Sequence, residues 1–167
     1  MEEESKHPFI VHLESLREDR GALAALRRGL GQPPGSVPAM YAYIVPWLPK
    51  EVPPWTEAAY YLIAALFAYH PAEGGTGNVG QHFAQVRARE GDDSALERRF
   101  MALLAAHPED LPTYLRQAIS FLKSKDVPIN WQALFYDVQR WGHPDRYIQK
   151  RWARAFWGRR KQEADSG

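Results

Sequence analysis

The segment from Glu57 to Tyr69 restricts the possible folds more than any other, because as a helix it would be apolar on nearly every side. A helix of this kind must be surrounded by other protein elements or by lipid. The apolar run that starts at Ala58 is only about 12 residues long, whereas a helix that crosses a bilayer needs about 20. The segment therefore predicts a helix at the centre of a bundle, with Thr56 as its N-terminal cap.

Segments with helical periodicity lie on both sides of this one, separated by Pro/Gly-rich loops. No stretch combines sustained alternation with β-branched residues, so we expect no sheet. Further helices are expected to begin at Pro8 and Ala95 and to cover residues 20–30, 39–45, 79–90, 108–125, 131–141 and 144–157. The sequence predicts an all-α fold, a single-domain helical bundle of about eight or nine helices over residues 8–158. Residues 1–7 are expected to form a flexible N-terminus, and residues 159–167 a flexible basic and polar tail.

Short polar side chains, glycine and prolines mark the expected helix ends. Side chains able to accept a hydrogen bond from the first turn of a helix stand at Asp19, Asn78, Ser94 and Asn130. Gly31 would stop the helix that covers residues 20–30. Pro108 and Pro144 suit the first turns of the last long helices, where a missing N–H costs nothing.

The stretch from Ile129 to Trp157 combines tryptophans with cations. It contains four of the six tryptophans, at positions 131, 141, 152 and 157, and tryptophans at helical spacing are more often core than ligand platforms. Residues 140–161 hold eight lysines and arginines and a single acid, in a chain whose net charge is +1. Arg146, Lys150 and Arg154 recur every four residues, which predicts a cationic ridge on the last helix.

Most catalytic and metal-binding chemistry has no support in the sequence. The absence of cysteine excludes disulfides and thiolate sites, and the six histidines are scattered without metal-ligand spacing. The run Gly75–Gly80 spells G-x-G-x-x-G, but a dinucleotide site needs a strand before it, so we interpret it as a flexible connector. We expect no enzyme activity, cofactor, metal site or membrane partner. The acidic start is unlike a secretory signal and favours the cytoplasm.

Basic residues lie off the apolar stripes of several helices. These cationic faces comprise Arg20, Arg27 and Arg28, then Arg98 and Arg99, then Arg116 and Lys123, and finally the ridge of Arg146, Lys150 and Arg154. If the bundle brings several of them to one side, they form a track for a phosphate backbone, because a guanidinium can hold two phosphate oxygens. Such contacts position a strand without reading its sequence.

Seven segments that together span most of the chain carry a resemblance to a known family. They are residues 19–31 (DRGALAALRRGLG), 37–49 (VPAMYAYIVPWLP), 57–71 (EAAYYLIAALFAYHP), 77–83 (GNVGQHF), 97–104 (ERRFMALL), 111–131 (LPTYLRQAISFLKSKDVPINW) and 143–157 (HPDRYIQKRWARAFW). In their order and spacing, the sequence resembles the small subunit of the type I-E Cascade CRISPR surveillance complex, the CasB family.

The resemblance implies an all-α, non-enzymatic subunit that is present as two copies and contacts other Cascade subunits. It would support the guide RNA–target DNA duplex and the displaced DNA strand in antiviral defence, while base pairing carries the specificity. The family's backbone contacts fall on Arg27, Arg28, Arg99, Arg116 and Lys123 of this sequence. Arg98 is a further candidate that could instead face solvent or a neighbouring subunit. The Arg146/Lys150/Arg154 ridge, inferred from spacing alone, could contact nucleic acid or the second copy.

Two other functions remain open. A helical protein–protein adaptor would pair the same cations with acidic partner surfaces and would have no affinity for isolated strands. A small hydrolase or nuclease would need a metal site that no motif supports, and it would cleave its substrate only when metal is present.

Overall fold

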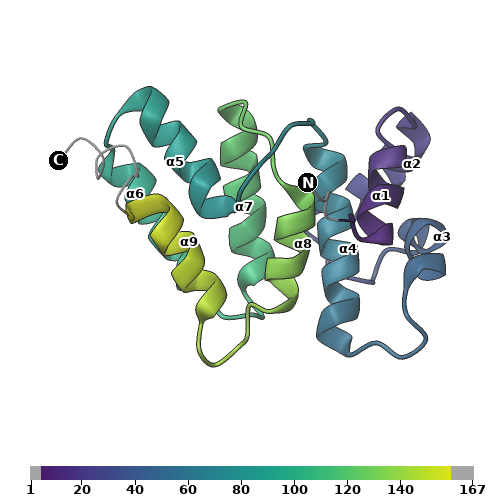
Figure 1. Ribbon diagram of the computed structural model, residues 1–167. Coiled ribbons are helices and arrows are strands. Elements are labelled where there is room, and N and C mark those ends of the chain that lie inside the picture. Colours follow the sequence, from purple (N-terminus) through teal and green to yellow (C-terminus); the bar gives the residue numbers. More distant parts are fainter. Residues whose placement is uncertain (1–4, 159–167) are drawn as a thin grey trace.

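The computed structural model describes residues 5–158, which form an all-α bundle (Figure 1). This range contains nine α-helices and two short 3-10 helices and no strand, which confirms the predicted fold class. Their bounds are α1 Pro8–Ser15, α2 Arg20–Arg27, η1 Pro38–Met40, α3 Tyr41–Ile44, η2 Val45–Trp47, α4 Pro54–Tyr69, α5 Val79–Glu90, α6 Ser94–Leu104, α7 Leu111–Ser124, α8 Trp131–Gln139 and α9 Tyr147–Trp157. Among these helices, none has the length and apolar character needed to cross a membrane. Residues 1–4 of the predicted flexible N-terminus and the predicted tail at residues 159–167 lie outside the described residues.

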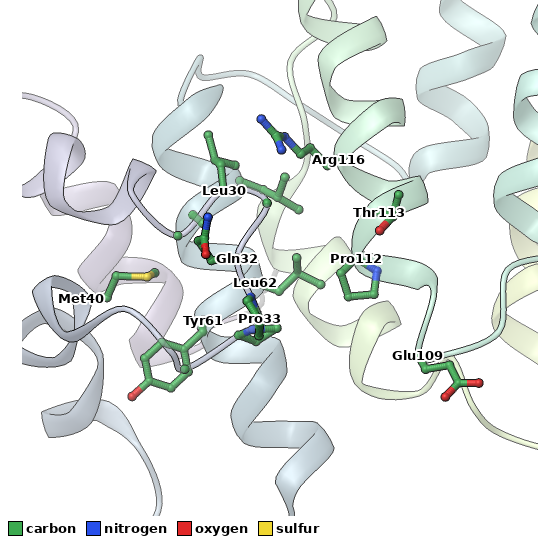
Figure 2. A pocket seen from close by; sticks show the side chains of 16 residues that line it. Leu30, Gln32, Pro33, Met40, Tyr61, Leu62, Glu109, Pro112, Thr113 and Arg116 are labelled. Carbon is green, nitrogen blue, oxygen red and sulfur yellow. The ribbon is translucent and has the colours of Figure 1, made fainter.

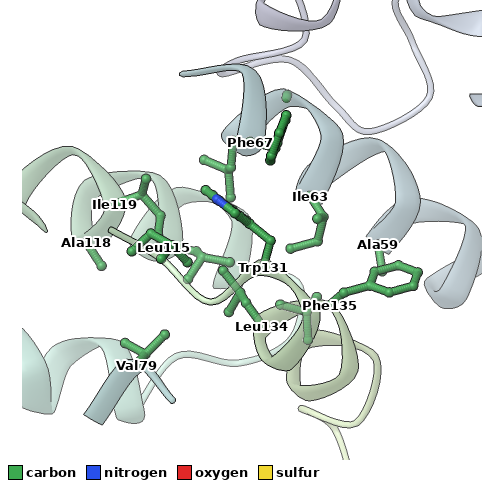
Figure 3. Close-up of a cluster of buried hydrophobic side chains, with 14 of the residues drawn as sticks. Ala59, Ile63, Phe67, Val79, Leu115, Ala118, Ile119, Trp131, Leu134 and Phe135 are labelled. Carbon is green, nitrogen blue, oxygen red and sulfur yellow. The ribbon is translucent and has the colours of Figure 1, made fainter. Parts of the chain in front are cut away.

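The apolar helix α4 occupies the centre of the bundle, as predicted. It is 16 residues long, with α2 packed against it on one side and α8 on another. In Figure 1, α1 to α3 lie to one side of α4, and α7 and α8 lie to the other, followed by α5, α6 and α9. Figure 3 shows Ile63 and Phe67 of α4 among the buried side chains around Trp131 of α8. The Phe67 and Trp131 rings meet edge to face, with centroids 5.8 Å apart.

Three of the four tryptophans near the C-terminal end belong to the core, as predicted. Trp131, Trp141 and Trp152 are buried, whereas Trp157 keeps 41% of its surface exposed. The indole N–H of Trp152 donates a 2.7 Å hydrogen bond to Oδ2 of Asp137. The ring of Trp152 also packs on that of Trp141, with centroids 4.9 Å apart. A buried hydrogen bond therefore joins α9 to α8, and aromatic packing joins α9 to Trp141 in the turn that follows α8.

The G-x-G-x-x-G run serves close packing. No strand precedes it; α4 does, and Gly80 already belongs to α5. A Cβ at Gly80 would collide with the backbone carbonyl of Trp152, and one at Gly75 would collide with the backbone of Ile129. Glycine at position 80 lets α5 approach α9, its main packing partner, and glycine at position 75 lets the loop before α5 lie against the backbone of Ile129, just before α8. Of this run, only the residues before Val79 connect α4 to α5, and Val79 and Gly80 belong to α5.

The polar N-terminal caps were predicted in part. Asp19, Asn78 and Asn130 each accept a hydrogen bond from the first turn of α2, α5 or α8, as expected, and Gln81 completes a capping box with Asn78. The cap of α6 is Asp93, one residue before the predicted Ser94. Both are good caps, so the sequence did not separate them.

Prolines shifted the other helix ends. Helix α4 begins at Pro54, so the predicted cap Thr56 lies inside its first turn. Pro108 and Pro144 lie in turns that precede α7 and α9 rather than in their first helical turns. Pro112 takes that role in α7.

The predicted stop of α2 at Gly31 comes too late in the sequence. Gly31 has φ +76°, but helix α2 has already ended at Arg27.

Candidate nucleic-acid interface

Helix α7 has one buried and one exposed face. Leu115, Ile119 and Leu122 are fully buried, whereas Arg116 and Lys123 are exposed. The apolar residues recur at three- and four-residue spacing, so the remaining positions are turned away from the core. Both predicted cations of this helix therefore reach the surface.

A groove of about 530 Å³ follows the exposed face of α7 beside α6. We call it the α6–α7 groove; its lining residues are Arg99, Thr113, Arg116, Gln117, Ser120, Phe121 and Ser124. The lining contains guanidinium, hydroxyl and amide groups and no carboxylate. Within residues 5–158, none of the nine predicted site cations takes part in an ion pair. The groove is thus a cationic, hydrogen-bonding surface whose charges are not already neutralised by neighbouring acids.

Arg99 enters this groove from α6. Its guanidinium carbon lies 4.5 Å from the ring centroid of Phe121 on α7. A guanidinium over an aromatic face is attracted by the ring while its N–H edges remain available for hydrogen bonds. Phe121 therefore holds Arg99 at the groove without neutralising its charge.

Arg116 lies where α7 meets the turn that follows α2. A Cβ at Gly31 would collide with the guanidinium of Arg116. Gly31 also has a positive φ of +76°, a conformation that glycine adopts without strain. Gly31 therefore allows both the turn and the position of Arg116 beside it.

Lys123 and Arg27 each contact the last turn of α4. Nζ of Lys123 lies 4.1 Å from the ring centroid of Tyr69, and Oη of Tyr69 lies 3.2 Å from Oγ of Ser120 in the groove. Nη1 of Arg27 donates a 3.3 Å hydrogen bond to the carbonyl of Ala68. The fold thus gathers predicted cations from α2, α6 and α7 along one band that includes the α6–α7 groove.

Arg28 and Arg98 are less closely tied to this band. Both are exposed. Nη1 of Arg98 lies 3.4 Å from Oγ of Ser94 on its own helix. Arg98 borders a hollow of about 320 Å³ that also contacts Tyr114 and adjoins the groove, since Arg99 and Gln117 line both. It therefore lies beside the groove, not in the groove lining itself.

The predicted ridge on α9 is not part of the groove. Lys150 and Arg154 are exposed on α9. Arg146, however, precedes the helix with φ 53°, and its Nη2 donates a 2.7 Å hydrogen bond to the carbonyl of Leu104 at the end of α6. Helix α9 packs mainly on α5, so these three cations do not extend the α6–α7 groove.

The comparison with known families decides what kind of chain this is. A family model for CRISPR-associated protein Cse2 matches residues 22–157. The chain belongs to the Cse2 family. A CRISPR-associated protein Cse2 from Thermus thermophilus is 34% identical over 154 residues, which cover 90% of this chain and 86% of the relative. The resemblance inferred from the seven segments is confirmed.

Solved Cse2 structures share the fold. The crystal structure of a Cse2-family protein from T. thermophilus matches with a TM-score of 0.79 at 31% identity, covering 90% of this chain and 96% of that one. CasB from M. ruber matches with a TM-score of 0.76 at 32% identity, covering 95% and 93%. A chain of a CRISPR RNA-guided surveillance complex matches with a TM-score of 0.78 at 27% identity, covering 89% and 88%.

Sequence reasoning missed two cation–aromatic pairs on the Cse2 surface near α9. The guanidinium carbon of Arg140 lies 3.5 Å from the ring centroid of Tyr136, and that of Arg151 lies 5.0 Å from the centroid of Tyr147. Both pairs are four residues apart, so helical spacing carried a signal for them. By contrast, the pair of Arg99 and Phe121 joins two helices, and no local pattern marks it.

The buried titratable groups of this Cse2 chain lie in the core. Burial lowers the pKa of His82 to about 4, so its imidazole is neutral near pH 7. Burial also raises the pKa of Asp137 to about 6, although the hydrogen bond from Trp152 opposes the shift. Among residues 5–158, no group of three or more His, Cys, Asp or Glu side chains could hold a metal ion. Neither buried group lines the α6–α7 groove.

Proposed function

We propose that this Cse2-family chain is a non-catalytic, nucleic-acid-binding subunit of a CRISPR RNA-guided surveillance complex of the Cascade type. The observation that carries the proposal is the α6–α7 groove, with cations from two helices and no carboxylate in its lining. The similarity of the whole chain to a chain of a CRISPR RNA-guided surveillance complex supports its place in such a complex. In that setting the chain takes part in antiviral defence in the cytoplasm.

The side chains of the groove favour contacts to the sugar–phosphate backbone of a nucleic acid. Guanidinium groups bind phosphate oxygens in pairs, and hydroxyl and amide groups can add hydrogen bonds to phosphates or sugars. Arg99 and Arg116 supply the charge, while Ser120 and Gln117 supply neutral donors. Contacts of this kind hold a strand at any sequence, so the guide RNA supplies the specificity by base pairing.

The strands that the groove serves are the guide RNA–target DNA duplex and the displaced DNA strand. Arg27, Arg28, Arg99, Arg116 and Lys123 would contact their backbones. Arg98 and the α9 cations Arg146, Lys150 and Arg154 are further candidates, and they lie on surfaces that other subunits or a second copy of this chain could also reach. We also propose, from the family resemblance alone, that the complex contains two neighbouring copies of this chain.

A salt series tests the proposal directly. Binding of the full chain to a fluorescent single strand of mixed sequence is measured for wild type and for a triple variant, Arg27→Glu, Arg116→Glu and Lys123→Glu. Each phosphate contact that is lost should lower the slope of log K against log salt by about 0.7 for a single strand. We expect a steep wild-type slope that flattens in the triple variant, with both proteins equally helical by circular dichroism.

Two results would contradict the proposal. Equal affinities and equal salt slopes for the wild type and the triple variant would show that these three cations do not contact the strand. No binding at low salt, for the isolated chain and for the chain within a reconstituted complex, would favour a protein–protein adaptor. Incubating the strand with the chain and Mg²⁺ checks the absence of catalysis, since strand cleavage that requires the metal would indicate a nuclease.

A further inference from the structure

A second cavity opens beside the α6–α7 groove. It has a volume of about 480 Å³ and lies between the loop of residues 29–35, helix α4 and the start of α7 (Figure 2). This volume falls within the range of small-molecule pockets, about 300–1,000 Å³. Its walls are mostly apolar, from Leu30, Met40, Leu62, Leu66 and Pro112. We call it the α4–α7 pocket.

The pocket and the groove share a boundary. Arg116 and Thr113 line both of them. Arg116 is exposed, and its guanidinium lies against the backbone of Gly31 at the edge of the pocket. A phosphate held by Arg116 in the groove would therefore stand at the mouth of an apolar cavity.

The polar groups of the pocket are few and differ in charge. Figure 2 shows Thr113 and Pro112 between Arg116 and Glu109, while Gln32 lies on the side of the view away from Glu109. A carboxylate repels a second phosphate but accepts hydrogen bonds from amino groups, as it does from the N4 amino group of cytosine. An amide and a hydroxyl can each donate and accept. The pocket thus suits an uncharged group with flat apolar faces and a polar edge, attached to an anion.

We infer that the α4–α7 pocket takes an unpaired nucleobase from the strand whose phosphate is held by Arg116. The inference rests on the proposed function, since the groove must carry a nucleic-acid backbone for a base to reach the pocket. A base engaged in a duplex is stacked and paired, so it has to leave the duplex before it can enter. The pocket therefore makes this surface prefer a single strand to a duplex of the same charge density.

Strands with and without bases distinguish phosphate binding in the α6–α7 groove from base binding in the α4–α7 pocket. The full chain is titrated with a fluorescent DNA strand of mixed sequence and with a strand of equal length in which every nucleotide is an abasic tetrahydrofuran site. The abasic strand retains the phosphates and reports the groove alone. One stacked base contributes enough that the normal strand should bind at least about fivefold more tightly.

Filling the pocket supplies the structural control. Leu62→Trp places an indole in the cavity from α4, and Leu62→Met keeps the original volume. We expect Leu62→Trp to reduce the ratio between the two strands to about one and to leave abasic-strand binding unchanged, while Leu62→Met retains the wild-type ratio. Gln32→Trp, on an exposed loop position, fills the same pocket from the other wall and should give the same result if Leu62→Trp fails to fold.

Each outcome has one meaning. Salt-dependent binding of the abasic strand with no gain from bases keeps the groove and overturns the pocket. A gain from bases that survives both pocket-filling variants also overturns it, because the bases are then contacted elsewhere. Failure of both strands to bind, both to the isolated chain and to the chain within a reconstituted complex, overturns the proposed function. A gain that Leu62→Trp or Gln32→Trp abolishes supports both proposals.

Discussion

The α6–α7 groove and the α9 region both have aromatic and cationic side chains on helices, but these side chains are placed differently in the two regions. In α9 the aromatic residues Trp152 and Phe156 are fully buried, and Lys150 is exposed on the other side of the helix. In the groove, Phe121 lies beneath an exposed cation from another helix, Arg99. Phe156 also has a cation from another helix on its ring, but this Arg87 of α5 is half-buried and donates to the carbonyl of Phe156. An amphipathic pattern by itself therefore anchors a helix, whereas an interface needs cations gathered from several helices.

The largest expected effect is the loss of Trp152 from the α9 side of this comparison. Trp152→Ala removes a fully buried ring and leaves the buried carboxylate of Asp137 without its indole donor. We expect the free energy of unfolding to fall by about 3–5 kcal/mol. Urea denaturation followed by circular dichroism measures it.

Trp157→Ala is the matched control, since Trp157 lies on the same helix but is 41% exposed. Its cost should be well below that of Trp152→Ala. Equal costs for the two variants would show that burial does not distinguish the two tryptophans, and α9 would then not be the core anchor described above.

The next largest effect concerns the contact between α5 and α9. Gly80→Ala adds a methyl group that must push against the carbonyl of Trp152. Overpacking of this kind should destabilise the protein by about 1–3 kcal/mol, measured by thermal unfolding. Gly21→Ala is the control, because a Cβ there meets only Oδ1 of Asp19, at 3.6 Å. The control should be neutral or slightly stabilising, since Gly21 lies in the first turn of α2 and alanine is a better helix former than glycine. A harmless Gly80→Ala would mean that the two helices can separate freely.

Much of this fold follows from local patterns in the sequence, and the exceptions have physical reasons. The apolar segment of α4 predicted a central helix, and Asn78 predicted the start of α5, because both signals lie within one helix. The boundaries were wrong where two residues compete for one role, such as Asp93 and Ser94. Proline misled in the same way: Pro144 fits a first helical turn, but here it lies in the turn before α9.

The candidate site could be predicted only residue by residue. Spacing placed Arg116 and Lys123 off the core stripe of α7, and both are exposed. The partners of these cations come from elsewhere in the chain, such as Gly31 for Arg116 and Tyr69 for Lys123. Contacts across helices depend on how the helices pack, which periodicity does not encode. For the same reason no motif marked the α4–α7 pocket.

A smaller effect tests whether groove cations bind nucleic acid more than α9 cations do. Arg99→Gln and Lys150→Gln each remove one positive charge from an exposed position. We expect Arg99→Gln to weaken single-strand binding about tenfold, the loss of one hydrogen-bonded charged contact, and to lower the salt slope by about 0.7. Fluorescence anisotropy at several salt concentrations measures both quantities. Lys150 lies outside the groove, so Lys150→Gln should leave binding of an isolated strand near the wild-type values, and its proposed contact would form only within the complex. Equal effects of the two substitutions would show that the Arg146/Lys150/Arg154 ridge binds an isolated strand as well as the groove does.

The smallest effect examines the aromatic support beneath Lys123. Tyr69→Leu removes the ring that lies 4.1 Å from Nζ of Lys123, while retaining an apolar side chain at this half-buried position. A cation–aromatic contact at an exposed site is worth about 0.5–1 kcal/mol, so strand affinity should fall only about twofold to fivefold as Lys123 becomes less ordered. Tyr69→Phe keeps the ring and loses only the contact to Ser120, and its affinity should stay close to wild type. If Tyr69→Phe weakens binding as much as Tyr69→Leu, strand affinity depends on the Tyr69 hydroxyl that contacts Ser120 and not on the Tyr69 ring. The aromatic side chain would then serve the groove as a hydrogen-bonding group, and the proposed contrast with the buried aromatic residues of α9 would rest on Phe121 and Arg99 alone.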